Sequence, residues 1–262
     1  MEPVFRSLEI TARLAVRATG TRITFRGLDN LPVTGGAVVA INHTSYVDFL
    51  PAGLAATERG RRMRFMIKAE MDEVKVVHYL IKHTGTIPVD RRAGAGAYTV
   101  AVDALRSGEL VGVYPEATIS RSFELKEFKT GAARMASEAG VPIIPLIVWG
   151  AQRIWTKDHP KSLGRKRIPI SVAVGEPIRA AGSVARIDES LRAGMSALLT
   201  EAQRDYPAPQ GAYWVPHRLG GSAPTLAQAK RLDEAELAER ARKRASEGTG
   251  KNGRASEATG KN

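Results

Sequence analysis

The chain has 262 residues, of which 43% are hydrophobic, so it is long enough for one large α/β domain with additional segments. It contains no cysteine, which excludes disulfides, thiolate metal sites and cysteine nucleophiles, and its five histidines form no zinc-binding pattern such as HExxH. The formal net charge of +12 favours anionic partners: nucleic acid, a membrane surface or phosphorylated ligands.

The low aromatic content argues against nucleic acid as the anionic partner. Aromatic residues make up only 6% of the chain and do not interleave with Lys and Arg, so we expect no nucleic-acid partner. No run of eighteen apolar residues is present, so we expect no transmembrane helix. Charged residues interrupt the N-terminal segment, so we expect no signal peptide.

The first predicted element is an amphipathic helix over residues 3–19, within an N-terminal segment of residues 1–20. Its apolar residues alternate with Arg6, Arg13 and Arg17. Two interpretations stay open for this helix: a peripheral membrane anchor, or an ordinary helix packed on the domain.

Residues 21–215 are predicted to form one domain in which strands alternate with helices. This alternation favours an α/β fold with a mixed, mainly parallel central sheet flanked by helices. The predicted strands are 22–27, 37–42, 63–67, 86–89, 110–114, 141–149 and 168–174, and the predicted helices are 46–57, 68–83, 95–107, 129–139 and 183–204.

The last segment, residues 216–262, differs in composition. Residues 225–247 are rich in Ala, Glu, Lys and Arg and predict a solvated helix. A ten-residue repeat then begins at Arg244 and again at Arg254, with no apolar side chain larger than Ala. Because such a repeat cannot bury a core, we expect a disordered basic tail.

A histidine and an aspartate with four residues between them follow the predicted strand at 37–42. His43 lies in the turn after the strand, and Asp48 lies in the first turn of the next helix, where the helix N-terminus favours an ionised carboxyl group. An imidazole held by a carboxylate can act as a general base on a hydroxyl. The alternative is a helix N-cap at Thr44 or Ser45 beside a histidine without a catalytic role.

Three further segments carry groups suited to anionic ligands. Arg91 lies just past the strand at 86–89, and guanidinium grips phosphate oxygens well. The second loop follows the strand at 110–114 and contains Glu116, Thr118, Ser120 and Arg121. The third begins a helix with Lys129, where backbone N–H groups favour anions. For each segment alone, an ordinary turn or helix start explains the residues equally well.

Together, these segments resemble the PlsC-type glycerolipid acyltransferases, the family of the 1-acylglycerol-3-phosphate acyltransferases. The family shows four blocks in order: NHxSxxD, GxxxxxR, FPEGTRS and an apolar VPIxP block. Here they correspond to Asn42–Asp48, Gly85–Arg91, Tyr114–Ser120 and Val141–Pro145.

The resemblance implies direct acyl transfer from a thioester to the sn-2 hydroxyl of 1-acylglycerol 3-phosphate, forming phosphatidic acid. His43 would be the general base and Asp48 would orient it. Arg91 and Glu116 would be the main acceptor-binding residues, and the secondary ones would be Thr118, Ser120, Arg121 and Lys129. No cofactor or metal is implied, because acyl-CoA or acyl carrier protein is a donor substrate. The enzyme would work peripherally at the cytoplasmic face of an anionic membrane.

The chain departs from the family pattern within the FPEGTRS block. Ala117 and Ile119 stand where FPEGTRS has Gly and Arg. Because this Arg is missing, an alternative function stays open: a related acyltransferase that uses glycerol 3-phosphate or another lysophospholipid as acceptor. An alternative of a different class is a non-catalytic basic adaptor that binds membranes or nucleic acid, and a serine hydrolase is disfavoured because no GxSxG motif is present.

Overall fold

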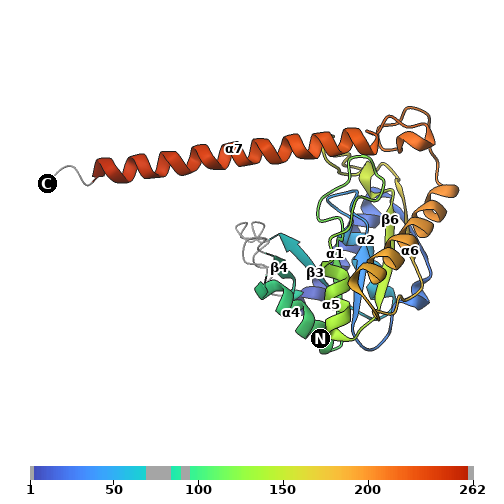
Figure 1. Cartoon of the computed structure of the whole chain (residues 1–262). Coiled ribbons are helices and arrows are strands. Elements are labelled where there is room, and N and C mark those ends of the chain that lie inside the picture. The colour runs from blue at the N-terminus through green and yellow to red at the C-terminus, as the bar shows by residue number, and fades with distance from the viewer. Residues whose placement is uncertain (1–2, 69–83, 90–94, 259–262) are drawn as a thin grey trace. The chain divides into compact units, whose positions relative to one another are not determined.

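The computed structural model of the chain describes residues 3–68, 84–89 and 95–258 (Figure 1). The chain divides into two compact units. The first contains Met1–Ser120 and Leu125–Pro207, and the second contains Arg121–Glu124 and Ala208–Asn262. The chain therefore leaves the first unit for four residues directly after Ser120 and then returns to it.

The first unit is built on a seven-stranded sheet in the order β1-β7-β6-β2-β5-β3-β4. All neighbouring strands are parallel except β6 and β7, which are antiparallel. The sheet is therefore mixed and mainly parallel, as the sequence predicted. The strands are β1 (Arg22–Arg26), β2 (Ala37–Ile41), β3 (Met63–Lys68), β4 (Ile87–Val89), β5 (Leu110–Val113), β6 (Ile143–Trp149) and β7 (Pro169–Val174).

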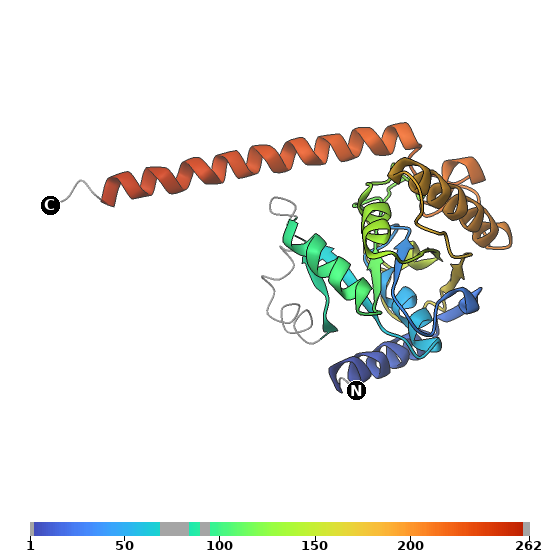
Figure 2. The same ribbon diagram turned by 60° about the horizontal axis from the view of Figure 1, so that its bottom comes forward.

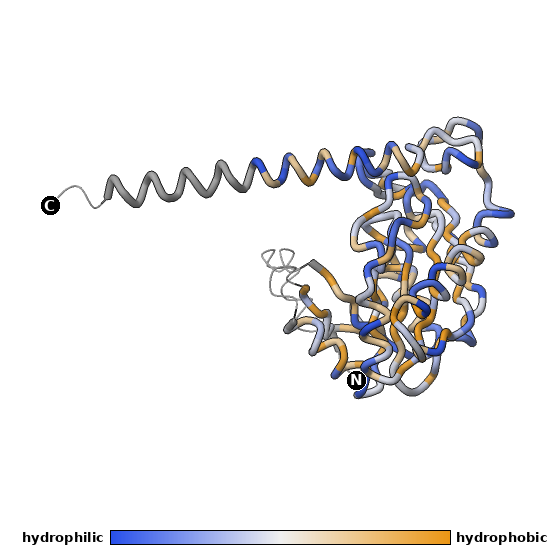
Figure 3. The backbone as a smooth tube through the Cα atoms, viewed as in Figure 1, coloured by the Kyte–Doolittle hydropathy of each residue, from blue (hydrophilic) through white to orange (hydrophobic). Residues whose placement is uncertain are grey.

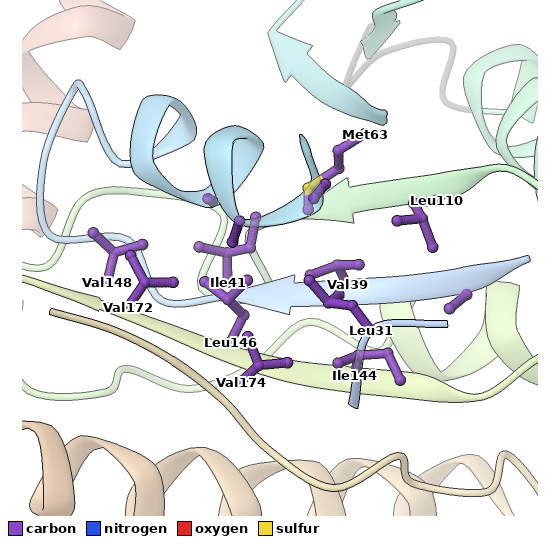
Figure 4. Close-up of a cluster of buried hydrophobic side chains, with 14 of the residues drawn as sticks. Leu31, Val39, Ile41, Met63, Leu110, Ile144, Leu146, Val148, Val172 and Val174 are labelled. Atoms are coloured by element: carbon purple, nitrogen blue, oxygen red, sulfur yellow. The ribbon is translucent and has the colours of Figure 1, made fainter. Parts of the chain in front are cut away.

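The central strands are buried on both faces. Every residue of β2, β5 and β6 is buried, which is why these segments read as continuous apolar runs instead of alternating patterns. Figure 3 shows these hydrophobic segments concentrated within the first unit. Figure 4 shows one core cluster, in which Val39 and Ile41 of β2 lie near Leu146 of β6 and Val174 of β7.

Helices cover both faces of the sheet (Figures 1 and 2). Helix α2 (Phe49–Glu58) packs on β3, β6 and β7, and α1 (Pro3–Thr19) contacts α2. The helices α4 (Ala95–Arg106), α5 (Gly131–Ala139) and α6 (Val184–Arg204) pack on one another and on the other face. Within the described ranges, the short 3-10 helices are η1 (Leu28–Asn30), η3 (Ala151–Arg153) and η4 (His217–Leu219).

The second unit contains α7 (Leu226–Ala258) and an internal ion-pair cluster. The buried guanidinium of Arg121 donates to Asp233 and to Glu236 of α7, the latter at 2.9 Å. Glu236 also pairs with Arg240 one turn further along the helix. The short segment that begins at Arg121 is therefore fixed to α7 by charge.

The predicted strands and helices agree with the structure wherever it describes them. The helix predicted over 68–83 lies outside the described residues, apart from Lys68, which ends β3. The helix predicted over 225–247 is present, and its backbone continues to Ala258, through the first copy of the repeat. Gly248, Gly250 and Gly253 lie within this extension, and glycine is a poor helix former, so local propensity does not account for it. Among the described residues, no helix has the length and apolar character needed to cross a membrane.

Candidate active site

The predicted site forms where two parallel neighbouring strands end. Strands β2 and β5 pair with Ala40 opposite Val113, so the residues that follow them meet at the same edge of the sheet. His43 follows β2 and Tyr114 follows β5, and their rings stack with centroids 4.0 Å apart. The strand order therefore joins two motifs that are about 70 residues apart in the chain.

Asp48 holds the imidazole of His43 from within the same turn. Its Oδ2 lies 3.3 Å from His43 Nδ1 and also accepts the backbone N–H groups of Thr44 at 2.8 Å and Ser45 at 2.7 Å. The Asp48 side chain is fully buried, whereas 20% of the His43 side chain is exposed. Because Nδ1 faces Asp48, Nε2 is the nitrogen available to a substrate.

Burial has the larger effect on the Asp48 carboxyl group. Desolvation raises the pKa of Asp48 above its usual value, and the hydrogen bonds from His43, Ser45 and Thr44 oppose that shift. The sequence placed this group in the first helical turn, where we expected the helix N-terminus to favour the ionised form. The structure corrects that expectation: Asp48 is the N-cap residue, and burial outweighs the stabilising contacts.

The backbone of His43 is held from the opposite loop. Its N–H donates to Glu116 Oε1 at 2.8 Å, and its carbonyl oxygen accepts the Ser120 N–H at 2.7 Å. Glu116 Oε2 accepts the Lys126 N–H at 3.0 Å, so both carboxyl oxygens are engaged by backbone. Burial raises the pKa of Glu116 to about 7.

Two residues that the sequence analysis did not single out complete this frame. The Asn42 side chain accepts the Val148 N–H at 2.7 Å and donates to the Val148 carbonyl at 3.0 Å, which ties β2 to the end of β6. Tyr114 stacks on His43, as described above, and desolvation raises the pKa of its hydroxyl well above the usual value. Both residues directly follow a buried strand, and that position was the only sign in the sequence that they belong to the site. Their contacts could not be predicted, because they depend on which strands are neighbours in the sheet.

His43 opens into an apolar cavity of about 840 Å³ in the first unit. Helix α1 contributes Phe5 and Leu8, α2 contributes Phe49 and Leu50, and β3, β5 and α5 supply further apolar side chains. The inner side of α1 is thus part of the cavity wall. A cavity of this size and polarity is suited to an apolar ligand chain, and His43 lies in its wall.

The predicted substrate-binding residues are not all at this cavity. Lys129 lines it, whereas Glu116 and Ser120 are buried in the loop that braces His43, and Thr118 Oγ1 accepts a hydrogen bond from Lys126 Nζ at 2.7 Å. Arg121 belongs to the second unit, where it pairs with carboxylates, and Arg91 lies outside the described residues. Their roles in substrate binding stay predictions.

The structure shows how the chain accommodates Ala117 and Ile119 in place of the Gly and Arg of the FPEGTRS block. Ala117 has φ of 60°, a left-handed conformation that glycine adopts without steric cost. The side chain of Ile119 is buried, with 3% exposure, so it faces the protein interior and not a ligand. Ala117 therefore keeps the backbone turn of a glycine, while Ile119 supplies packing in place of a charge.

Comparison with known proteins agrees with this geometry. Residues 22–149, which include His43, Asp48 and Glu116, match the family model described as Acyltransferase. The 1-acyl-sn-glycerol-3-phosphate acyltransferase of Bacillus subtilis is 28% identical over 154 residues, which are 58% of this chain and 72% of the relative. A chloroplastic enzyme of the same name from Arabidopsis thaliana is 27% identical over 137 residues, which are 51% of this chain but only 37% of that protein.

The fold is also that of a solved acyltransferase. The crystal structure of the 1-acyl-sn-glycerophosphate acyltransferase PlsC from Thermotoga maritima superposes with a TM-score of 0.67 at 22% identity, covering 78% of this chain and 81% of that one. The strand-end His–Asp pair, the family match and this fold agree with the four ordered sequence blocks. The chain is therefore similar to PlsC-type glycerolipid acyltransferases in sequence over residues 22–149 and in fold.

Proposed function

We propose that the protein is a 1-acylglycerol-3-phosphate O-acyltransferase. It transfers a fatty acyl group from acyl-CoA or acyl carrier protein to the sn-2 hydroxyl of 1-acylglycerol 3-phosphate, and phosphatidic acid and the free thiol are the products. The observation that carries this proposal is the His43–Asp48 pair, which opens into an apolar cavity large enough for an acyl chain. The names of the relatives support the same acceptor.

In the proposed mechanism, the acceptor hydroxyl attacks the thioester carbonyl while His43 Nε2 takes the hydroxyl proton. The tetrahedral intermediate collapses, the C–S bond breaks, and the leaving thiolate receives the proton from His43. Asp48 Oδ2 fixes the imidazole through Nδ1 and stabilises the imidazolium that forms. No covalent acyl-enzyme is needed, because both substrates react within one ternary complex.

The acceptor phosphate requires a cation at the edge of the cavity. Arg62 and Lys129 are the cationic side chains that line the cavity among the described residues, and Arg62 lies over the ring of Phe5. We assign the phosphate to Lys129, with Arg91 as the second expected contact. The family has Arg at the position of Ile119. Isoleucine is uncharged and this one is buried, so the loop offers no side-chain charge to the phosphate at that position.

Thiol release tests the proposed reaction. Purified protein should release free thiol from palmitoyl-CoA only when 1-acylglycerol 3-phosphate is present, and His43→Ala should lower the turnover by roughly 10²–10⁴. His217→Ala is the control, since His217 is an exposed histidine of the second unit. Normal turnover in His43→Ala would refute the mechanism.

A second acceptor stays open because of Ile119. An acyltransferase specific for glycerol 3-phosphate or another lysophospholipid would show the same His43 dependence but a different acceptor profile. Thiol release measured with each acceptor, and with acyl carrier protein as well as acyl-CoA, separates these alternatives.

We also propose that the enzyme works peripherally at the cytoplasmic face of a membrane. Helix α1 supports this location: while its inner side lines the cavity, Ile10 and Leu14 are 51% and 60% exposed. Arg6 and Arg17 are exposed on the same helix. Flotation of the protein with anionic vesicles tests this proposal, and the absence of binding at low salt would contradict it.

A further inference from the structure

A strongly basic loop joins η3 to β7 in the first unit. Residues 157–167 are exposed over most of their length, and Leu163 is 70% exposed although it is apolar. The loop contains one acidic residue, Asp158, and the cations Lys157, Lys161, Arg165, Lys166 and Arg167. An exposed leucine among cations is characteristic of surfaces that meet both headgroups and apolar chains.

Aromatic side chains lie directly beside this loop. The Trp155 and Tyr46 rings are 4.6 Å apart, and Lys161 Nζ lies 3.9 Å from the centre of the Trp155 ring. The Tyr46 N–H donates to the Trp155 carbonyl at 3.1 Å, which fixes the two segments together. Tyr46 and Phe49 remain 43% and 47% exposed, so the cluster is not a closed core.

Two of these aromatic side chains also belong to the cavity that contains His43. Tyr46 and Phe49 line it together with His43. The far end of the loop reaches helix α1, where the Arg167 N–H donates to the Thr19 carbonyl at 3.2 Å. The basic loop, the exposed aromatics and the catalytic cavity are thus continuous within one unit.

We propose that Tyr46, Phe49, Trp155 and the loop 157–167 form a docking surface for an anionic lipid bilayer, distinct from the outer side of α1. We refer to these residues as the aromatic–basic surface. The inference rests on the proposed function, because a lipid substrate must pass between the bilayer and the cavity. Docking at this surface places the cavity rim, through Tyr46 and Phe49, at the level of the headgroups.

The chemistry favours a bilayer over other anionic partners. Tyr and Trp have an apolar body and a polar edge, which suits the membrane–water interface. The cations match anionic headgroups, and Leu163 can enter the acyl region. A nucleic acid would use the cations but would leave Leu163 exposed to water.

Charge removal tests the electrostatic part of the proposal. The triple variant Arg165→Gln, Lys166→Gln, Arg167→Gln keeps the proximal carbons of each side chain but loses three charges. Each Lys or Arg near an anionic leaflet contributes about a fivefold factor, so partition of the full-length protein onto phosphatidylcholine–phosphatidylglycerol vesicles should fall by roughly 100-fold.

The matched control removes equal charge elsewhere in the first unit. Arg179, Arg186 and Arg204 are exposed and lie outside the aromatic–basic surface, so their triple Gln variant should bind the vesicles within about threefold of the unaltered protein. Equal loss in both triple variants would overturn the proposal, because net charge alone would then explain binding. Retained binding in the loop variant would overturn it as well.

Tryptophan fluorescence tests the aromatic part. Trp149 and Trp214 are buried, with 2% and 8% exposure, whereas Trp155 is more exposed. Brominated phosphatidylcholine in anionic vesicles should quench the emission of the protein, and Trp155→Phe should remove that quenching. Quenching that survives in Trp155→Phe would overturn the proposed insertion.

These binding measurements do not depend on turnover. His43→Ala should float with vesicles as the unaltered protein does, even if the acceptor assignment is wrong. The loop variant should keep its turnover on short-chain, monomeric substrates but lose it on substrates held in vesicles. Equal loss on both substrate forms would contradict a docking role.

Discussion

The substitution Asp48→Asn isolates the charge of the carboxylate from its geometry. In the structure, Asp48 Oδ2 accepts two backbone N–H groups and faces His43 Nδ1, whereas Oδ1 has no hydrogen-bond partner among the described residues. An asparagine can place its oxygen at the position of Oδ2 and its amide nitrogen at that of Oδ1. The turn and the imidazole orientation should therefore persist, and only the charge is lost.

The magnitude follows from the distance. For unit charges 3.3 Å apart, an effective dielectric constant of about 20 gives an interaction of about 5 kcal/mol between carboxylate and imidazolium. Since about 1.4 kcal/mol corresponds to a tenfold change in rate, kcat should fall by roughly 10³–10⁴ if the imidazolium is nearly complete in the transition state. The acceptor KM should change little, because Asp48 is buried and does not line the cavity.

The assay is thiol release from palmitoyl-CoA at saturating acceptor, with thermal unfolding measured in parallel. Asp29→Asn is the control, since the Asp29 side chain is 96% exposed. If kcat of Asp48→Asn stays within tenfold of the unaltered protein while the fold is intact, stabilisation of an imidazolium by Asp48 is refuted.

Three further predictions concern stability. Ala117→Gly should stabilise the protein by about 1 kcal/mol in urea unfolding, because glycine adopts φ of 60° without steric cost; a loss of stability would contradict this. Glu116 has its folded pKa raised to about 7 from 4.5, so its contribution to stability should fall by about 3 kcal/mol as pH rises from 4.5 to 7. Glu116→Gln should remove this part of the pH dependence, and an unchanged difference between pH 5 and pH 8 would refute it. Arg121→Met should cost about 2 kcal/mol, since it removes the guanidinium that pairs with Asp233 and Glu236; unchanged unfolding would show that these two pairs contribute nothing.

Local patterns were enough to predict the helices and strands and the pairing of His43 with Asp48. Buried strands appear in the sequence as short apolar runs, and the strand–helix alternation indicates the α/β class. The pairing of His43 with Asp48 is also local, since both lie in one turn between β2 and α2. Such features need no knowledge of which strands are neighbours.

The contacts of the second loop could not be predicted in the same way. That Glu116 accepts the His43 N–H depends on β2 lying beside β5, an arrangement set by long-range packing. The sequence analysis assigned Glu116, Ser120 and Arg121 to the acceptor because polar residues after a strand indicate a ligand site. In the structure, Glu116 instead accepts the backbone N–H groups of His43 and Lys126, and Arg121 pairs with two carboxylates of α7.

The contacts that hold His43 and Asp48 in place differ from the positions expected to select the acceptor. His43 is held through its own N–H and carbonyl groups by Glu116 and Ser120, and Asp48 is held by two backbone N–H groups. None of these contacts involves the side chains of Ala117 or Ile119, at which the chain lacks the Gly and Arg of the family block. Substitution there can alter the acceptor site while the base keeps its geometry. The departures are therefore compatible with an intact acyl-transfer centre and direct the search for differences toward the acceptor.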